Sequence, residues 1–234
     1  MGKVQMSGIV PQLVAPSKPI PENFADATWE QIIEVCQTGA VPDTWEVGDQ
    51  KAMTINGTDY AIDIIGKNHD TYSDGSGTAP LTFQMHDCYG TKYTMSKWSD
   101  NTGGWKECDM RNTHLSTILS LMPSEVQAGI KEVNKKSGAG QGTTTINTTA
   151  DKLFLLSEIE IFGSVTYSVA GEGSQYAYYS AGNSKIKNLN GSAQNWWLRS
   201  WYLTTAFSCV YSDGSNGHAD AANNAMGVAP AFCF

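Results

Sequence analysis

Apolar residues recur at helical spacing in one segment near the start of the chain, D-A-T-W-E-Q-I-I-E-V-C (residues 26–36). One face of a helix presents residues at positions i, i+3, i+4 and i+7, and this segment follows that pattern. Thr28 can cap the helix because Gln31, three residues later, completes a capping box. We expect the helix to end at Gly39. Its apolar positions are Trp29, Ile32, Ile33 and Cys36.

Alternating apolar residues on both sides of Asn56-Gly57 predict a β-hairpin. Asn-Gly is the strongest two-residue hairpin signal because both residues tolerate a positive φ angle. The alternating positions then fall on one side of the two strands. A third strand is expected over residues 80–85 (P-L-T-F-Q-M). The alternating residues of the hairpin are Ile55, Tyr60, Ile62 and Ile64.

Helical periodicity returns after Gly104, where an apolar stripe continues to Met122 and predicts one helix. Pro123 has the character of a first helical residue and predicts a second helix after it. The following residues predict a polar turn, a short buried strand, a short helix and then long loops rich in Gly, Ser, Tyr and Asn. These segments are 137–149, 151–157, 157–163 and 163–191, in that order.

Four prolines between residues 8 and 24 predict an extended arm, because proline is excluded from helix interiors and central strands. We therefore divide the chain into an arm (residues 1–25) and a single domain (residues 26–234). The domain alternates helices with a hairpin and short strands, which is typical of the α+β class. Its expected architecture is a small mixed or antiparallel sheet with long loops.

Composition and charge narrow the classes of partner. A chain of 234 residues with 41% hydrophobic residues can bury one sizeable core. Its formal net charge of −8 argues against nucleic acid and anionic membranes as partners. No apolar run approaches the roughly 20 residues of a membrane span, and the first residues lack the pattern of a signal peptide. We expect neither membrane insertion nor a signal peptide.

Residues that carry common chemistries are scattered. The sequence has no phosphate-binding glycine loop, no nucleophile elbow and no zinc-ligand spacing, so we expect no catalytic residue, no metal and no cofactor. Its four histidines are isolated, and the acidic turn at residues 70–77 lacks the spacing of a calcium loop. The five cysteines are expected to be buried thiols, with one disulfide as the alternative. They are Cys36, Cys88, Cys108, Cys209 and Cys233.

Aromatic residues in the last third leave two interpretations open. Tyr176, Tyr178 and Tyr179 can form either a sugar-binding platform or part of the core. Trp197 is expected in the core. Arg199, between two tryptophans and a serine, is expected to donate hydrogen bonds to loop carbonyls rather than to a ligand.

The stretch from Trp201 to Met226 contains no Lys, Arg, Glu or Gln. It is rich in Ala, Ser, Asn, Thr, Gly, Asp and Tyr, the residues that antibody loops use for binding. Apolar segments flank it, N-W-W-L-R-S (195–200) before and G-V-A-P-A-F-C-F (227–234) after. Because leaving the last eight residues in water costs about 25 cal/mol per Å² of apolar surface, we expect them to pair back into the sheet of the N-terminal strands.

We interpret residues 195–234 as a binding region in which a buried frame supports exposed contact residues on one face. The frame residues are Trp196, Trp197, Arg199, Val228 and Phe232. The predicted contact residues are Trp201, Tyr202, Leu203, Thr204, Thr205, Phe207, Ser208, Ser215, Asn216, His218, Asp220, Asn223, Asn224 and Met226.

Several motifs resemble a domain family found in gut prophages and bacteria. They are C-D-M-R-N-T-H-L (108–115), D-K-L-F-L-L-S-E-I-E (151–160), W-W-L-R-S (196–200), V-Y-S-D-G (210–214) and G-V-A-P-A-F-C-F (227–234). This family is similar to the C-type lectin-like fold of the formylglycine-generating-enzyme type. That fold serves as the variable protein of diversity-generating retroelements, in which adenine-directed mutagenesis rewrites chosen codons.

The resemblance implies a hypervariable receptor-binding module of a phage tail or surface protein, not an enzyme. Asparagine codons mutated at adenine cannot give Lys, Glu or Gln, which agrees with the composition of residues 201–226, although Trp201 and Met226 cannot arise in that way. The implied partners are a bacterial surface protein or glycan, and other virion proteins through the arm. The implied location is a virion, or the bacterial cytoplasm before assembly, and a homo-oligomer stays open.

Two alternatives accompany this interpretation. One is a structural tail or capsid decoration protein without variable binding. The other is an oxidase like the formylglycine-generating enzyme, which uses paired cysteines and copper, and Cys209 and Cys233 lie 24 residues apart in two expected strands. The sequence around these two cysteines lacks the surroundings expected of such an active site. The calcium-binding motifs of sugar-binding lectins are also missing, so the word lectin refers to the fold alone.

Overall fold

A computed structural model describes residues 18–234, apart from the side chains of residues 218–220. Most of the predicted arm lies outside the described residues. The helices are short, and most of them follow one another in groups between the strands. They are η1 (Phe24–Asp26), α1 (Trp29–Thr38), α2 (Gly104–Glu107), the π-helical turn η2 (Met110–His114), α3 (Leu115–Leu121), α4 (Ser124–Gly129), α5 (Glu158–Phe162) and α6 (Ala177–Ser180).

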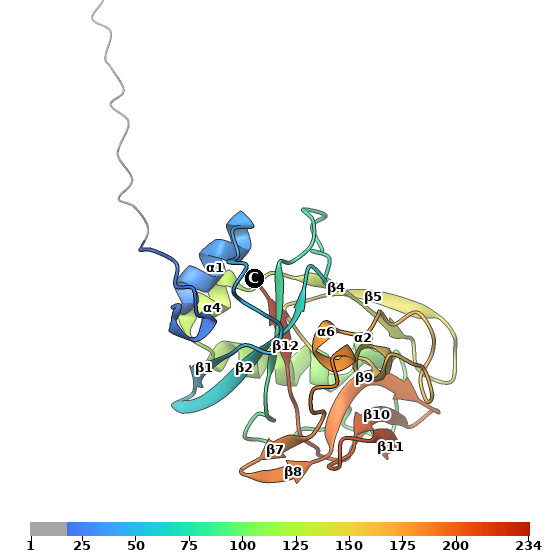
Figure 1. Ribbon diagram of the computed structural model, residues 1–234. Helices are drawn as coiled ribbons and strands as arrows, with labels where there is room; N and C mark the ends of the chain where they lie inside the picture. Colours follow the sequence, from blue (N-terminus) through green and yellow to red (C-terminus); the bar gives the residue numbers. More distant parts are fainter. Residues whose placement is uncertain (1–17) are drawn as a thin grey trace, which may run out of the picture.

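The strands form small antiparallel sheets (Figure 1). The largest has the order β1-β2-β3-β12-β6, a second has the order β11-β10-β9, and the pairs β4-β5 and β7-β8 are hairpins. The strands are β1 (Gln50–Ile55), β2 (Thr58–Lys67), β3 (Leu81–Met85), β4 (Val133–Gly138), β5 (Ile146–Asp151), β6 (Leu153–Phe154), β7 (Lys187–Leu189), β8 (Ser192–Gln194), β9 (Trp196–Tyr202), β10 (Ala206–Val210), β11 (Asn216–Ala221) and β12 (Ala231–Cys233).

This arrangement confirms the α+β class and several local predictions. Helix α1 begins with the capping box of Thr28 and Gln31 and ends at Gly39, which has a φ of 72°. The β1-β2 hairpin turns at Asn56-Gly57, where both residues have positive φ. Strand β3 follows as expected.

The last strand pairs back into the N-terminal sheet, as the apolar ending predicts. Strand β12 lies between β3 and β6, with Phe232 opposite Phe83. Phe234 is fully buried and its carbonyl oxygen accepts a 2.5 Å hydrogen bond from the Tyr72 hydroxyl. The rings of Phe83, Phe232 and Phe234 contact one another at centroid distances of 5.4 Å. The chain end is therefore part of the central core.

The predicted boundary between arm and domain after residue 25 is too late. Phe24 is buried against Trp45, with ring centroids 5.3 Å apart. The Trp45 indole donates to the carbonyl of Pro21, and the Gln31 side chain donates to the carbonyl of Pro19. The chain from Pro19 onward is thus bound to the core through backbone carbonyls, which proline retains.

The helix predicted over residues 104–122 is broken into α2, η2 and α3. Cys108 has an extended backbone, with a ψ of 153°, and ends α2. The Asn112 side chain donates to the carbonyls of Lys106 and Cys108, which stabilises the break. Pro123 is the N-cap of α4 rather than its first residue. Local side-chain hydrogen bonds to the backbone therefore compete with the helical pattern at Cys108.

The polar segment over residues 137–149 forms most of the β4-β5 hairpin rather than a turn throughout. Its strands alternate between buried and exposed residues, but the buried positions carry Lys135, Ser137, Thr149 and Asp151. A hydrophobic pattern cannot reveal a strand whose inward positions are polar. The reason for these polar positions is a buried cluster of charges.

Lys135 and Arg199 are the two cations of this buried ion cluster, and both bind Glu160. Lys135 Nζ lies 2.8 Å from Glu160 Oε1 and 2.7 Å from Asp70 Oδ1. Arg199 donates to both oxygens of Glu160 and to the carbonyls of Lys136, Leu155 and Glu172. All four charged side chains are at most 3% exposed. The expected hydrogen bonds of Arg199 to carbonyls are therefore present.

The cluster connects parts of the chain that are far apart in sequence. Asp70 follows β2, Lys135 is in β4, Glu160 is in α5 and Arg199 is in β9. Burial opposes the ionisation of Glu160, but the charges of Arg199 and Lys135 outweigh it and lower its pKa. Two cations and two anions thus balance inside the core.

Replacing Arg199 with alanine will lower the free energy of unfolding by about 3–5 kcal/mol, because Glu160 and three carbonyls lose a buried partner. Urea denaturation followed by circular dichroism measures this change. Lys152→Ala, at an exposed position of the same charge type, is the control and is expected to change stability by less than about 0.5 kcal/mol. Equal effects of the two substitutions would contradict the structural role of Arg199.

Stability will fall as the pH decreases from about 4 to about 2. Burial opposes the ionisation of Asp70, but the charge and hydrogen bond of Lys135 outweigh it and lower the pKa of Asp70 to about 2. Its pKa in the unfolded chain is about 4. Because the folded pKa is the lower one, the stabilisation is complete above the unfolded value and is lost as the pH falls through the folded value. Urea unfolding at a series of pH values measures the slope, which Asp70→Asn must flatten.

Candidate functional site

The C-terminal frame is inside the molecule. Trp196, Trp197, Arg199, Val228 and Phe232 are all fully buried. The two indoles donate hydrogen bonds to the carbonyls of Lys185 and Tyr93, at 3.0 and 2.9 Å. Both tryptophans thus pack in the core and bind backbone groups, which leaves neither free for a ligand.

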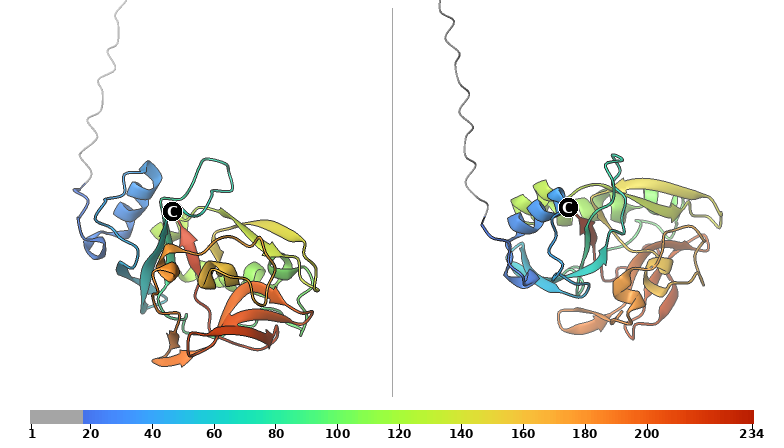
Figure 2. Two further views of the ribbon diagram at one scale, coloured as in Figure 1. Left: turned by 45° about the vertical axis from the view of Figure 1, so that its right-hand side comes forward. Right: turned by 45° about the horizontal axis from the view of Figure 1, so that its top comes forward.

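Exposed residues of the C-terminal region lie in the turns of the β9-β10-β11 sheet. Leu203, Thr204 and Thr205 form the turn between β9 and β10, and Leu203 is 58% exposed. Ser215 belongs to the turn between β10 and β11, and residues 223–225 follow β11. Figure 2 shows this sheet, in orange and red, at the opposite end of the molecule from α1. The predicted contact residues that are exposed or partly exposed are Tyr202, Leu203, Thr204, Thr205, Ser215, Asn216, Asn223 and Asn224.

Four predicted contact residues are buried, and the prediction of an exposed position is wrong for them. Phe207 and Ser208 have no exposed surface because both sides of β10 are covered. The Trp201 indole lies so close to Gly138 that a Cβ atom there would be 1.9 Å from its Nε1. Met226 pairs with Tyr93 through two backbone hydrogen bonds. The side chains of two further predicted residues, His218 and Asp220 in β11, lie outside the described residues.

The exposed residues form two groups, one at each end of β10. The backbone N–H of Ala222 donates to the carbonyl of Thr205 at 2.9 Å, so residues 223–225 lie beside the β9-β10 turn. The β10-β11 turn is at the other end of β10, because this strand is antiparallel to both neighbours. Five strand residues span about 17 Å. The exposed contact residues are therefore divided between the two ends of β10, and their clustering on one face stays a prediction.

Side chains from outside the region fix the backbone of the β9-β10 turn. The amide of Asn101 lies within 3.3 Å of the carbonyl oxygens of Tyr202, Leu203 and Ala206. The amide of Gln141 donates to the carbonyl of Thr204 at 2.9 Å. Leu203 adopts a φ of 53°, a conformation that non-glycine residues rarely adopt. All the hydrogen bonds described here use main-chain groups of the turn, so its side chains are not required for them.

The β10-β11 turn is supported partly from outside and partly by side chains of its own residues. The side-chain oxygen of Asn195, just before β9, accepts a 2.9 Å hydrogen bond from the backbone N–H of Ser212. Within the turn, Asp213 accepts from the backbone and the hydroxyl of Ser215. The Asn216 side chain donates to Glu158 at 2.6 Å. A loop that precedes the C-terminal region in sequence binds the same carboxylate.

Glu158 is fully buried and binds the loop over residues 164–170. Its carboxylate accepts hydrogen bonds of 2.8 to 3.1 Å from the backbone N–H groups of Thr166, Tyr167 and Ser168. The Tyr167 ring then contacts the Tyr202 ring edge to face, with centroids 5.7 Å apart. The exposed turn surface thus continues onto this loop, which the sequence prediction did not include.

Two exposed apolar side chains beside the turns were also missed. Trp98 is 67% exposed and lies three residues before Asn101. Ile186 is 42% exposed and lies next to the β10-β11 turn, where a Cβ atom on Gly214 would be 3.2 Å from it. Trp98 is an isolated aromatic residue among polar neighbours in the sequence (S-K-W-S-D-N). This pattern could have indicated an exposed tryptophan. Exposed tryptophan is frequent at binding hot spots.

The other chemical groups considered from the sequence are structural. Tyr176, Tyr178 and Tyr179 are buried, so they do not form a surface platform for sugars. All five cysteines are buried, and none of them is in a disulfide. His86 binds Asp63 at 2.8 Å, and this hydrogen bond raises the pKa of His86. Among the described residues, no three His, Cys, Asp or Glu side chains gather as metal ligands.

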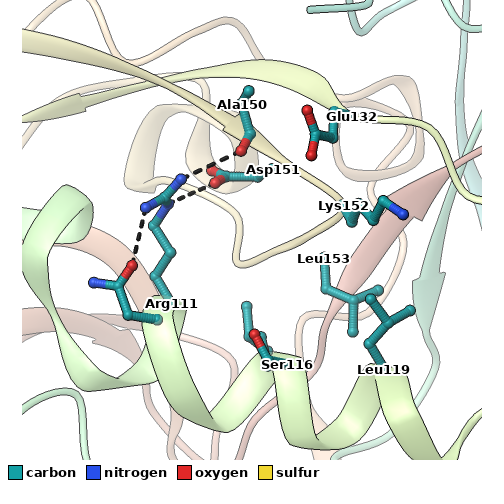
Figure 3. Close-up of a pocket in the computed structure, with 10 residues that line it drawn as sticks. Arg111, Ser116, Leu119, Glu132, Ala150, Asp151, Lys152 and Leu153 are labelled. Carbon is teal, nitrogen blue, oxygen red and sulfur yellow. Dashed lines mark hydrogen bonds and ion pairs between the residues drawn. The ribbon is translucent and has the colours of Figure 1, made fainter.

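A hollow of about 260 Å³ lies between α3 and the β5-β6 segment, beside Arg111 (Figure 3). The Arg111 guanidinium points to Asp151, with Nε 2.6 Å from Oδ1, and donates to the carbonyl of Ala150. Its remaining contacts are the carbonyl of Lys106 and the side chain of Asn112. Because the protein itself occupies nearly all of the Arg111 donors, this hollow is a poor site for an anion.

Asn101→Ala will destabilise the domain by about 1–3 kcal/mol, because three carbonyls of the β9-β10 turn lose their donor. Hydrogen exchange at residues 203–206 is expected to accelerate more than exchange in β12. Asn223→Ala, at an exposed position, is the control and is expected to leave both quantities unchanged. Uniform acceleration of exchange throughout the domain would contradict a local role in the turn.

Among the described residues, no helix is long and apolar enough to cross a membrane.

The comparisons with known proteins identify a family. No curated protein and no solved structure matches the chain significantly. A family model described as "Domain of unknown function (DUF6273)" matches residues 84–234, from β3 to the end of β12. This match includes the ion cluster except Asp70, and all of the exposed turns. Because it covers more than half of the chain, the protein belongs to the DUF6273 family.

Proposed function

We propose that this protein is a ligand-binding module whose contact residues are on the turns of the β9-β10-β11 sheet and on the adjoining loop over residues 164–170. One observation carries the proposal. Asn101 and Gln141, outside the β9-β10 turn, bind the main-chain carbonyls of that turn. Side chains on such a turn can be exchanged with little effect on its shape, which is what a diversified binding surface requires.

The chemistry of the surface supports the same function. Residues 200–212 contain no charged side chain, although the chain as a whole has 16% charged residues. Short polar and aromatic side chains lose less conformational entropy on binding than lysine, glutamate or arginine. Tyr202 and Tyr167, which contact each other, and the exposed Trp98 supply the apolar area that anchors an interface.

We further propose a C-type lectin-like fold of the formylglycine-generating-enzyme type, as found in variable proteins of diversity-generating retroelements. The α+β architecture and the return of β12 into the N-terminal sheet are in accord with it. Under this proposal, retroelement mutagenesis rewrites the exposed turn positions. Trp201, Phe207, Ser208 and Met226 then belong to the buried support rather than to the contact set.

The proposed biological role is attachment of a phage tail or surface protein to a bacterial surface protein or glycan. The blue start of the described chain lies on the α1 side in Figures 1 and 2, away from the β9-β10-β11 sheet. A module attached to a virion through its N-terminal arm would therefore present the turns outward. The proposed location is the virion, or the bacterial cytoplasm before assembly. The proposal also includes contacts of the arm with other tail proteins and a homo-oligomer.

The two alternatives differ in what they require of the surface. A decoration protein requires no exchangeable contact residues. The hydrogen bonds of Asn101 and Gln141 to the β9-β10 turn therefore give no specific support to that alternative. An oxidase requires reactive cysteines, whereas Cys209 and Cys233 are buried in separate sheets and burial raises the pKa of Cys233 far above its usual value. We therefore propose a binding role without enzymatic activity.

Substituting alanine for Leu203, Thr204, Thr205, Asn223 and Asn224 together will abolish binding while the melting temperature stays within about 3 °C of the original value. The measurement is flow cytometry of the fluorescently labelled protein on a panel of gut bacteria, combined with thermal denaturation. The control replaces exposed residues at the α1 end, Glu34→Ala and Gln37→Ala. Unfolding of the multiple variant, or unchanged cell binding, would contradict the proposal.

A further inference from the structure

A second hollow, of about 420 Å³, lies above the buried ion cluster and has a different chemistry from the exposed turns. Its volume is in the range of small-molecule sites. Segments from four parts of the chain line it: the residues after β2, strands β4 and β5, and the loop after α5. Three members of the cluster, Asp70, Lys135 and Glu160, line the hollow together with Glu172, whose carbonyl binds Arg199.

The charged groups at the base of this hollow are already paired. Lys135 donates to Asp70, Glu160 and the Tyr176 hydroxyl, which uses its three N–H groups. Glu172 accepts from the Ser200 hydroxyl and from the backbone N–H of Gly138. The charges of Lys135 and Arg199 balance those of Asp70 and Glu160, and burial raises the pKa of Glu172, which disfavours its charged form. The base therefore favours neither sign of charge.

The rim offers groups that both donate and accept hydrogen bonds. Thr71, Thr148 and Ser174 contribute hydroxyls for which the described residues contain no hydrogen-bond partner. His69 stacks on Tyr176 at a centroid distance of 3.9 Å, and burial lowers the pKa of His69. It is therefore neutral near pH 7, with one donor nitrogen and one acceptor nitrogen. Lys136 is the one exposed cation among the lining residues.

We propose that this hollow binds an uncharged polyhydroxylated ligand, a saccharide, between the rim of His69, Thr71, Thr148 and Ser174 and the neutralised base. Each sugar hydroxyl is both a donor and an acceptor, and the rim groups have the same dual character. The free saccharide and the end of a glycan chain present the same chemistry here. The hollow is lined by none of the turn residues, so this inference does not depend on the proposed binding surface.

The test is a titration of the ¹⁵N-labelled protein with neutral mono- and disaccharides, followed by amide chemical shifts. Inorganic phosphate and choline are the charged probes. We expect at least one saccharide to shift residues 69–71, 134–136 and 172–174 at concentrations up to about 10 mM. The double variant Thr148→Val, Ser174→Ala will weaken that binding roughly fivefold or more. Thr144→Val, an exposed threonine in the turn of the same hairpin, is the matched control and will leave it unchanged.

Three results would overturn the inference: no saccharide of the panel shifts these amides, phosphate or choline binds the hollow more tightly than any saccharide, or the double variant binds as the original protein does. If a saccharide does bind, comparing its free form with a surface-attached form distinguishes a free saccharide from the end of a glycan chain as the ligand. Because the turn variants retain this hollow, its failure and the failure of cell binding are observed separately.

Discussion

The pairing of Glu160 with Arg199 and Lys135 is the interaction on which the rest of the structure depends. Charged groups this deeply buried are tolerated only with complete partners. The requirement fixes β4, α5 and β9 relative to one another, since each contributes one member of the cluster. Arg199 lies three residues before Tyr202, so the same bonds also determine where the β9-β10 turn leaves the core.

The exposed turns that adjoin this strand and its neighbour β10 are held in place by hydrogen bonds to their backbones. Asn101, Gln141 and Asn195 bind main-chain groups, and Glu158 binds the neighbouring loop. Ordering a free loop on binding costs about 1–2 kcal/mol per residue in backbone entropy. A turn ordered in advance avoids that cost, whichever side chains it carries. This separation between support and contact is the physical basis of the proposed function.

Local signals in the sequence predicted much of the fold. The capping box at Thr28, the Asn56-Gly57 hairpin and the apolar ending at Phe234 each identified an element correctly, because each depends on neighbouring residues or on a continuous apolar run. The β4-β5 hairpin was missed because Lys135 and Asp151 occupy inward positions. Such positions carry charge only because distant residues supply partners, and no local pattern contains that information.

The binding region was predicted by composition, which cannot tell the two faces of a strand apart. Phe207 and Trp201 lie opposite each other in the sheet and are both buried, whereas Leu203 in the adjoining turn is exposed. The separation of the exposed residues into two groups follows from the antiparallel order of β9, β10 and β11. Tyr167 lies outside the segment whose composition was considered and joins the surface only through its contact with Tyr202.

The central claim is that the turn backbone keeps its shape whatever side chains it carries. A crystal structure of a variant with Leu203, Thr204 and Thr205 replaced by three other residues tests it most directly. We expect residues 201–206 to superpose on the original backbone and Asn101 and Gln141 to keep their hydrogen bonds to the turn carbonyls. A rearranged turn with those bonds broken would contradict it.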